Sequence, residues 1–295
     1  MPTAAQNPAL RRTLRAIVVG LVVFTVLLGG LAMLGLERNF IYFPSRAPGP
    51  SPAELGLSAE ELHIATPDGK RVHGYYIRSA GAVIDDRLTL IISHGNAGTV
   101  ADRLPRAALF HRALAVDVLL YDYRGYGQSS GSPTEEGTYI DARAAYDWLV
   151  TRGVPPARIV LFGESLGCAV SLQLALDRRV GGVVLEAPFL SVRAMAKQLF
   201  PRLPIGPLLR THYDNHGKVA RLTAPLFIVH GTHDELIPLA HGEALFAAAR
   251  EPKRFLAVPG AHHNDVYHVG GAAYLEALQS FLQECRASRS QASAR

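Results

Sequence analysis

The chain has 295 residues, of which 48% are hydrophobic and 19% are charged. This length and composition provide for a large buried core. The chain is therefore neither disordered nor a small domain that needs disulfides or a structural metal. Its two cysteines, Cys168 and Cys285, are too few for a four-cysteine zinc or iron–sulfur site.

The formal net charge of +5 is concentrated at the two ends of the chain. Residues 1–36 and residues 286–295 each contain three arginines and no acid, which leaves −1 for the body between them. That body has no basic stripe interleaved with aromatic residues, the pattern typical of nucleic-acid-binding proteins. We therefore predict no nucleic-acid partner, and we expect residues 286–295 to be a disordered basic tail.

Residues 16–36 (AIVVGLVVFTVLLGGLAMLGL) are a run of 21 residues without a charge. As a helix the run would be about 30 Å long, which matches the hydrocarbon core of a bilayer. The alternative is a cleaved signal peptide, but its apolar region is usually about 7–15 residues long and ends in a small-residue cleavage site. We therefore predict an uncleaved, single-pass transmembrane anchor over residues 16–36.

Three arginines closely precede this anchor, so the positive-inside rule predicts that residues 1–15 lie in the cytoplasm and the body lies outside it. After the anchor, FIYFPSRAPGPSP is rich in proline and small residues. This composition predicts a linker, which we place at residues 37–58. A single folded domain is then expected over residues 59–285.

Within that domain, short β-branched runs alternate with longer helical patterns. Two runs, residues 61–66 and 71–78, flank a Pro-Asp-Gly turn and predict a hairpin. Further strands are expected at 88–93, 116–122, 158–162, 180–186, 225–230 and 254–258, and helices at 101–113, 135–151, 165–177, 239–249 and 272–285. The alternation predicts an α/β fold, with a mostly parallel sheet, helices on both faces, and ligands beyond the carboxyl ends of the strands.

Ser165 is the candidate nucleophile, in the segment GESLG between the strand RIVLF and an apolar helix. A sharp strand-to-helix turn of this kind exposes the serine Oγ, and the flanking glycines leave room for it. The helix N-terminus also directs backbone N–H groups at a developing oxyanion. The short pattern also arises by chance, but its position between a strand and a helix favours the catalytic interpretation.

The segment SHGNAG follows the strand LTLII and is the candidate oxyanion loop. In the strand-to-helix architecture of serine hydrolases, one oxyanion N–H follows the nucleophile and the other comes from a loop at this place. We assign the two backbone donors to Leu166 and Asn96. The alternative is an ordinary glycine-rich loop.

The candidate acid and base follow the last two predicted strands. A carboxylate after PLFIV would orient the catalytic imidazole, and we choose Asp234 over its neighbour Glu235. Two adjacent histidines follow RFLAV, and only one of them can face Ser165. We favour His263 over His262 because it directly precedes Asn-Asp. The chain order serine, aspartate, histidine is typical of the α/β-hydrolases.

Other polar clusters support no separate chemistry. His230 and His233 with the two later histidines could suggest zinc, but the sequence has no H-E-x-x-H motif, so we predict no metal. Likewise, no glycine-rich phosphate-binding loop is present, so we predict no cofactor. The segment YDYRGYG is interpreted as a structural loop in which Asp122 and Arg124 form a pair.

As an ordered set, these motifs resemble the α/β-hydrolase fold serine hydrolases. Within that family, the chain is similar to the membrane-anchored α/β-hydrolase domain-containing group, whose animal members include protein depalmitoylases. The matching segments cover residues 40–285: IYFPS, SHGNAG, YDYRGYGQSSGSP, FGESLG, LEAPF, HGTHDELIP and HHND. The resemblance implies the triad Ser165, Asp234 and His263. The chain departs from the pattern in two ways: His262 stands where the family often has glycine, and the cysteine-rich lipidated N-terminus of the animal enzymes that lack a membrane helix is absent.

We therefore predict a serine hydrolase of carboxylic esters or thioesters, with a short lid between Glu186 and Pro225 that is apolar enough to contact an acyl chain. Its expected partners are a small acyl ester, a thioester or a lipid-like substrate, and the membrane that holds the anchor. One alternative is a serine aminopeptidase-type peptidase on the same fold. The other is a catalytically idle, membrane-bound binding protein.

Overall fold

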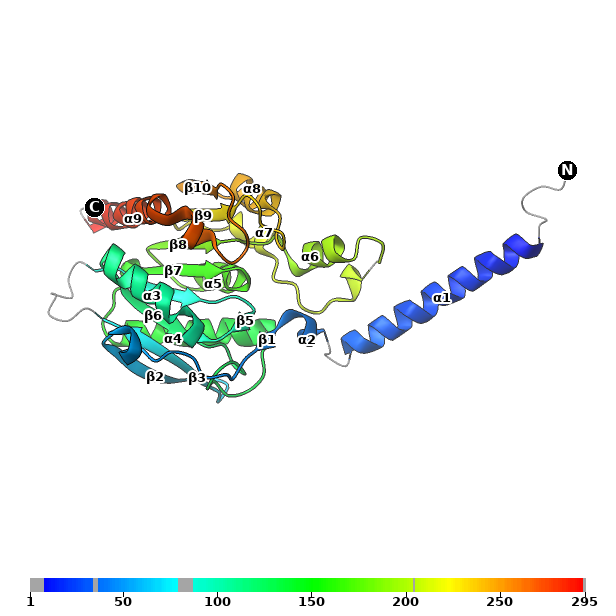
Figure 1. Ribbon diagram of the computed structural model, residues 1–295, viewed down its shortest axis with the longest axis horizontal. Helices are drawn as coiled ribbons and strands as arrows, with labels where there is room; N and C mark the ends of the chain where they lie inside the picture. The colour runs from blue at the N-terminus through cyan, green and yellow to red at the C-terminus, as the bar shows by residue number, and fades with distance from the viewer. Residues whose placement is uncertain (1–7, 34–36, 79–86, 204, 294–295) are drawn as a thin grey trace.

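The structure, a computed structural model, describes residues 8–33, 37–78, 87–203 and 205–293. Figure 1 shows a body built around one twisted sheet, and a long helix that projects away from it. The sheet runs in the order β2-β3-β6-β4-β7-β8-β9-β10. Its strands are β2 Ala59–Ala65, β3 Arg71–Ile77, β4 Thr89–Ser93, β6 Asp117–Tyr121, β7 Ile159–Glu164, β8 Gly182–Glu186, β9 Leu226–Gly231 and β10 Lys253–Val258.

The six strands from β6 to β10 in this order are parallel, and β3 pairs antiparallel with both β2 and β6. The strands and the hairpin predicted from the β-branched runs are thus confirmed to within a few residues at their ends. Their side chains alternate between two cores, as the strand geometry requires. On β7, for example, Leu161 packs in one core, whereas Val160 and Phe162 pack in the other.

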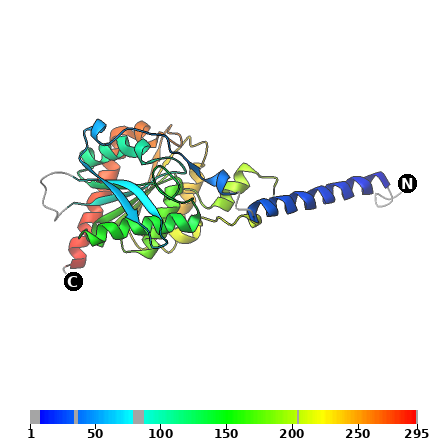
Figure 2. The ribbon, with the colours of Figure 1, turned by 90° about the horizontal axis from the view of Figure 1, so that it is seen from below.

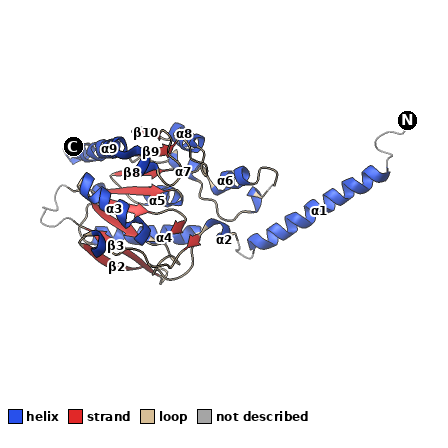
Figure 3. Ribbon diagram, in the orientation of Figure 1, coloured by secondary structure: helices blue, strands red, loops and turns tan. Residues whose placement is uncertain are grey.

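Helices cover both faces of the sheet, as predicted (Figure 3). One core includes residues of α4 Glu135–Thr151, α5 Leu166–Asp177, α7 Asn215–Val219 and α8 Leu239–Ala248. The other includes residues of α3 Val100–Leu114 and α9 Val266–Ser293. A short 3-10 turn, η3 Pro156–Arg158, precedes β7. Because the six strands from β6 to β10 are parallel, their carboxyl ends lie at the same edge of the sheet, where the sequence motifs are expected to meet.

The N-terminal helix α1 spans Pro8–Met33 and begins before the predicted start of the anchor at residue 16. It includes the three N-terminal arginines in its first turns. Residues Pro8–Gly30 are long and apolar enough to cross a membrane, and none of that span is buried in the body. Figures 1 and 2 show the helix extending outward from the body, so it is a candidate transmembrane helix.

The segment predicted as a linker is packed against the body. It contains α2 Arg38–Ile41, β1 Phe43–Pro44 and the 3-10 turn η2 Ala53–Leu55. Strand β1 pairs in parallel with β5 Ala97–Gly98. Tyr42 is buried, and its hydroxyl lies 2.8 Å from that of Tyr213. The proline-rich composition indicated a lack of repeating structure, but these tertiary contacts hold the segment in place.

The segment between β8 and β9 forms a small cap, which includes α6 Val192–Leu199 and the 3-10 turn η4 Gly206–Leu208. Helix α6 begins at Ser191, whose side chain accepts a hydrogen bond from the Ala194 N–H, a typical N-terminal cap. Two carboxylates hold the returning chain. Glu37 accepts from the backbone N–H groups of Arg210 and Thr211, and Glu135 accepts from those of the next two residues.

The C-terminal helix α9 is longer than predicted. It begins at Val266, has a non-helical break at Gly271 (φ 49°, ψ −128°), and continues to Ser293. Residues 286–293, which we expected to be a disordered tail, thus form its last turns.

Candidate active site

Ser165 lies between β7 and α5 with an unusual backbone conformation, φ 51° and ψ −110°. Its own N–H donates to the Glu186 carbonyl at 2.9 Å, which ties the turn to β8. The two glycines of the motif are required by close packing. A Cβ on Gly163 would lie 2.6 Å from the Cys168 Cα, and one on Gly167 would overlap the Ser93 carbonyl. The local sequence therefore imposes the strained turn that presents the serine.

The structure brings the three predicted polar residues into one chain of hydrogen bonds. His263 Nε2 lies 3.1 Å from Ser165 Oγ, and His263 Nδ1 lies 2.8 Å from Asp234 Oδ2. Each of the three residues is at most 9% exposed. They follow the carboxyl ends of β7, β9 and β10, which are separated in the sequence; in the sheet β9 and β10 are neighbours, and β8 lies between β7 and β9.

Asp234 is held by further donors. Its Oδ1 accepts from the backbone N–H groups of Leu236 and Ile237 at 3.0 and 2.7 Å, and His230 Nε2 lies 3.3 Å from its Oδ2. Burial raises the pKa of Asp234, but hydrogen bonds from His230 and His263 outweigh it, so the pKa lies well below its usual value. This carboxylate therefore stays ionised and can stabilise an imidazolium.

The two alternatives lie outside this arrangement. His262 Nδ1 is 3.1 Å from Glu235 Oε2, and both side chains are more than half exposed. Their contact is at the surface, and neither His262 nor Glu235 has a hydrogen bond to Ser165 among the described residues. The geometry thus brings His263 and Asp234, rather than their neighbours His262 and Glu235, into the hydrogen-bonded series with Ser165.

Asn96 and Leu166 both line the cavity in front of Ser165. Leu166 is the first residue of α5, where backbone N–H groups have no partner inside the helix. The carbonyl of Asn96 accepts from Phe43 N–H at 2.8 Å, and its side-chain amide donates to the Ile41 carbonyl. These contacts hold the loop of Asn96 at the edge of the cavity in front of Ser165.

A buried charge network beneath the serine was not predicted from the sequence. Glu164 contacts Arg103 at 3.0 Å and Arg106 at 3.4 Å, and Arg106 also contacts Glu186 at 2.8 Å. Burial raises the pKa of Glu164, but the two guanidinium charges dominate and lower it to about 2. The network ties α3 to β7 and β8 directly under the nucleophile. Its only sequence signal is a charged residue beside the serine.

His94 is also buried, at 1% exposure, in the loop before Asn96. Its Nδ1 lies 2.7 Å from the Gly95 carbonyl, and its ring packs 4.4 Å from that of Tyr123. Desolvation by burial, aided by the charge of Arg103, lowers its pKa to about 4. The imidazole is therefore neutral at physiological pH.

This burial predicts a pH-dependent loss of stability. An unfolded histidine has a pKa of about 6.5, so between pH 6.5 and 4 the unfolded chain binds a proton at His94 that the folded chain does not. The contribution is fully present above pH 6.5 and decreases as the pH falls, by about 3 kcal/mol at its limit. Urea unfolding at pH 7 and pH 4.5 should show a larger loss for the wild type than for His94→Gln. An equal loss in both proteins would contradict the assignment.

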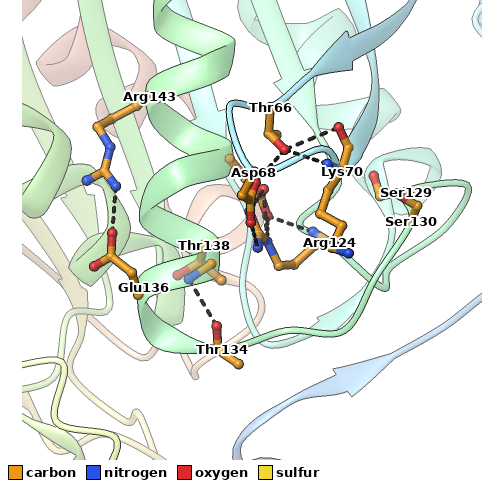
Figure 4. Close-up of polar contacts among 12 residues, drawn as sticks. Thr66, Asp68, Lys70, Arg124, Ser129, Ser130, Thr134, Glu136, Thr138 and Arg143 are labelled. Carbon is orange, nitrogen blue, oxygen red and sulfur yellow. Dashed lines mark hydrogen bonds and ion pairs between the residues drawn. The ribbon is translucent and has the colours of Figure 1, made fainter.

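The predicted pair of Asp122 and Arg124 is wrong. Arg124 Nη1 lies 2.6 Å from Asp68 in the hairpin turn (Figure 4). Its Nη2 lies 2.8 Å from Asp141 on α4. Asp122 instead accepts from the Val100 N–H at the start of α3, at 2.9 Å. Residues two apart on a continuing strand would share a face, but β6 ends at Tyr121 and the chain turns at Arg124, so the two side chains bind different elements. Arg124 thus joins the β2–β3 hairpin to α4.

A cavity of about 480 Å³ opens in front of Ser165. Apart from Glu37, Asn96 and Ser165, all of its lining residues are apolar. They come from the end of α1, from residues 37–43, from the cap and from the loop after Asp234. Its size falls within the usual range for small-molecule sites. The segment predicted as a linker therefore supplies one wall of the site.

Comparison with known proteins agrees with this architecture. Residues 89–205 match the family described as alpha/beta hydrolase fold. An uncharacterised protein of Mycobacterium tuberculosis is 39% identical, with coverage of 84% of this chain and 88% of that protein. Alpha/beta hydrolase domain-containing protein 17B of Homo sapiens is 34% identical, with coverage of 74% and 73%.

Among solved structures, an esterase of Pyrococcus furiosus superimposes with a TM-score of 0.68. It covers 83% of this chain and 98% of its own, at 19% identity, which is evidence for the fold alone. The relatives in sequence extend the similarity through most of the body. On this evidence the chain belongs to the α/β-hydrolase fold family, within the α/β-hydrolase domain-containing group that its motifs resemble.

Proposed function

We propose that the chain is a serine hydrolase that cleaves carboxylic ester or thioester bonds through an acyl-enzyme on Ser165. The observation that carries the proposal is the hydrogen-bonded series from Ser165 Oγ through both ring nitrogens of His263 to Asp234. This order of nucleophile, base and orienting carboxylate is what acyl transfer requires.

In the proposed reaction, His263 Nε2 takes the Ser165 proton as Oγ attacks the substrate carbonyl. The backbone N–H groups of Leu166 and Asn96 then stabilise the oxyanion of the tetrahedral intermediate. His263 returns the proton to the leaving alcohol or thiol, and the acyl group stays on Ser165. Water, activated by the same histidine, cleaves the acyl-enzyme and releases the carboxylic acid.

The cavity supports an apolar acyl group as the bound part of the substrate. A peptidase of the aminopeptidase type needs a group that binds the substrate's amino terminus. Glu37 is the only carboxylate lining the cavity among the described residues, and it already accepts hydrogen bonds from the backbone of Arg210 and Thr211. This arrangement favours an acyl ester or thioester over an aminoacyl substrate.

The test uses the full chain in detergent. A fluorophosphonate probe should label the protein, and mass spectrometry should place the label on Ser165. A panel of p-nitrophenyl esters and acyl thioesters of increasing chain length, run beside aminoacyl substrates, should give the highest kcat/KM for an acyl compound. A label on another residue, or turnover of aminoacyl substrates alone, would overturn the proposal. Absence of both labelling and turnover would favour an idle binding protein.

Replacing Glu37 should affect binding more than chemistry. Glu37→Ala removes the acceptor that holds the cap at residues 210–211, so we expect KM for a long-chain ester to rise about tenfold, the equivalent of one charged hydrogen bond. The kcat should change little because Glu37 does not contact Ser165. Glu54→Ala removes an exposed carboxylate on η2 and is the matched control. An unchanged KM in Glu37→Ala would contradict this role.

We further propose that α1 anchors the protein in a membrane, with its N-terminus in the cytoplasm and the body on the other side. The apolar length of α1 supports the span, and the three arginines in its first turns support the orientation. Protease added to intact cells should digest the body. A body protected until the cells are lysed would reverse the orientation, and a mature protein that begins after α1 would indicate a cleaved signal sequence.

A further inference from the structure

The cavity mouth is surrounded by exposed apolar side chains. Outside α1, eight large apolar side chains are exposed among the described residues, and six of them line the cavity: Phe40, Phe43, Leu199, Phe200, Leu203 and Leu236. Phe40 is 76% exposed and Leu199 is 55% exposed. Soluble monomers rarely gather exposed apolar residues in this way unless the patch binds something. We call α2 together with residues 192–203 and 205–210, which include α6 and η4, the cap surface.

Four cations between α6 and Arg210, in addition to Arg38 on α2, accompany these apolar residues. Arg193, Lys197, Arg202 and Arg210 are all exposed, and the sequence from residue 192 to residue 213 contains no acid. Within the described part of the chain, none of the four has an ion pair with a carboxylate. Arg193, Lys197 and Arg202 line a second cleft that adjoins the apolar cavity at Leu203. The cap surface therefore combines an apolar mouth with an uncompensated positive rim.

Helix α6 carries its apolar and its basic side chains on different faces. Val192, Met195 and Leu199 line the cavity, whereas Arg193 and Lys197 lie four residues apart in the other cleft. The apolar positions recur at the spacing of one helical face, which is typical of a helix that lies at an interface.

The cap surface also continues directly into the candidate transmembrane helix. Leu28, near the C-terminal end of α1, lines the same cavity as the cap, and Leu21 lines the second cleft. Figures 1 and 2 show α2 and α6 on the side of the body from which α1 projects. A membrane that holds α1 would thus lie on the same side as the cap surface.

We propose that the cap surface rests on a bilayer leaflet that contains anionic phospholipid, so that the cavity opens into that leaflet. The exposed phenylalanines and leucines contact acyl chains, and the four cations contact phosphate groups. Entry of the substrate acyl group from the leaflet rests on the hydrolase function proposed above; the membrane contact does not. A second copy of the chain fits less well, because a symmetric pair would place the four cations of each copy opposite those of the other.

The test places a reporter on the cap surface of the full chain. The protein has a single tryptophan, Trp148, and it lies on α4, 13 residues or roughly 20 Å of helix beyond Glu135, the residue that holds the cap. Phe200→Trp adds a second tryptophan at the cavity mouth. The wild type and this variant are reconstituted into vesicles whose acyl chains carry bromine, a short-range quencher. One set is pure phosphatidylcholine, and in the other a third of the phospholipid is phosphatidylglycerol.

Quenching should appear in Phe200→Trp, should be stronger in the anionic vesicles, and should be nearly absent in the wild type. Adding Arg193→Glu, Lys197→Glu and Arg202→Glu to Phe200→Trp should abolish the quenching in the anionic vesicles. The matched control reverses Arg179, Arg221 and Arg250, which precede β8, β9 and β10 at the opposite edge of the sheet, and it should leave quenching unchanged.

Activity separates this proposal from the proposed function. The triple reversal at the cap, without the added tryptophan, should lower turnover of an ester embedded in anionic vesicles by about tenfold or more. It should leave a short, water-soluble ester unaffected, because these three residues do not line the cavity. If no variant, nor the wild type, cleaves either ester, the hydrolase function fails while the quenching result still stands.

Three results would overturn the membrane proposal. The first is an unquenched Phe200→Trp in protein that has entered the vesicles. The second is quenching that is equal in both lipid mixtures and insensitive to charge reversal, which would remove the anionic partner. The third is a cross-link between cap surfaces of two copies, obtained in the vesicles, which would assign the surface to a dimer.

Discussion

Ser165→Ala should lower kcat for an ester by about 10⁶-fold, because it removes the hydroxyl that lies 3.1 Å from His263 Nε2 and that we propose as the nucleophile. The variant should also lose labelling by a fluorophosphonate probe. Its folded structure should persist, since the change removes one hydroxyl and leaves the turn between its two glycines intact. Steady-state kinetics, probe labelling and a thermal unfolding curve on the same preparation test all three points.

The control for this variant lies on the same helix. Ser171→Ala removes a hydroxyl on α5 that is 1% exposed and has no hydrogen-bond partner among the described residues. It should retain activity and labelling, so that a loss in both variants would indicate damage to the helix. Turnover by Ser165→Ala at a rate near that of the wild type would contradict the role of Ser165.

His263→Ala should lower kcat by about 10⁴-fold to 10⁶-fold, since among the described residues it removes the only base in contact with Ser165 Oγ. His262→Ala changes the adjacent residue, which is exposed and pairs with Glu235, and its kcat should stay within about twofold. The comparison uses two identical substitutions at neighbouring positions, so differences in expression or backbone are small. Equal losses in both variants would leave the base unassigned.

The carboxylates extend the same comparison. Asp234→Asn keeps the size of the side chain but alters the histidine tautomer that it stabilises, and a loss of about 10⁴-fold is expected. Glu235→Gln should have little effect. A reversed order of these two effects would move the orienting role to Glu235.

The sheet and the positions of the candidate residues were predictable because their signals are local. Each buried strand is a short β-branched run, and each motif directly follows one of these runs. In a parallel sheet, residues that follow strands meet at one edge whatever their separation in the sequence. This rule predicted that Ser165, Asp234 and His263 lie close together, and in the structure they form a series of hydrogen bonds. Their catalytic roles stay predictions until they are tested.

What the sequence did not indicate depends on contacts between distant segments. The Glu164 network joins residues about 60 positions apart, and no pattern in either segment specifies the partner. Tyr42 is buried and its hydroxyl contacts that of Tyr213, 171 positions away, but the composition of the segment around it gave no sign of this contact and resembled a linker. Conversely, the charge pattern of residues 286–295 suggested disorder, but alanine, arginine and glutamine are good helix formers, and α9 extends over residues 286–293 of this segment.

Only a few residues separate the candidate transmembrane helix α1 from Glu37, which lines the cavity. A cleavage in this part of the chain could therefore remove the helix with or without part of the cavity wall. Helix α1 spans Pro8–Met33, and the cavity is lined by Leu28 on this helix and by four residues from Glu37 to Phe43. Proteolytic cleavage between Met33 and Glu37 would release a body without α1 that keeps most of the cavity wall. Release after Phe43 would free a body with the same polar residues at Ser165 and an open, shallower groove. The exact cleavage point would therefore decide whether a released body keeps the cavity, and with it the substrate preference, of the full chain.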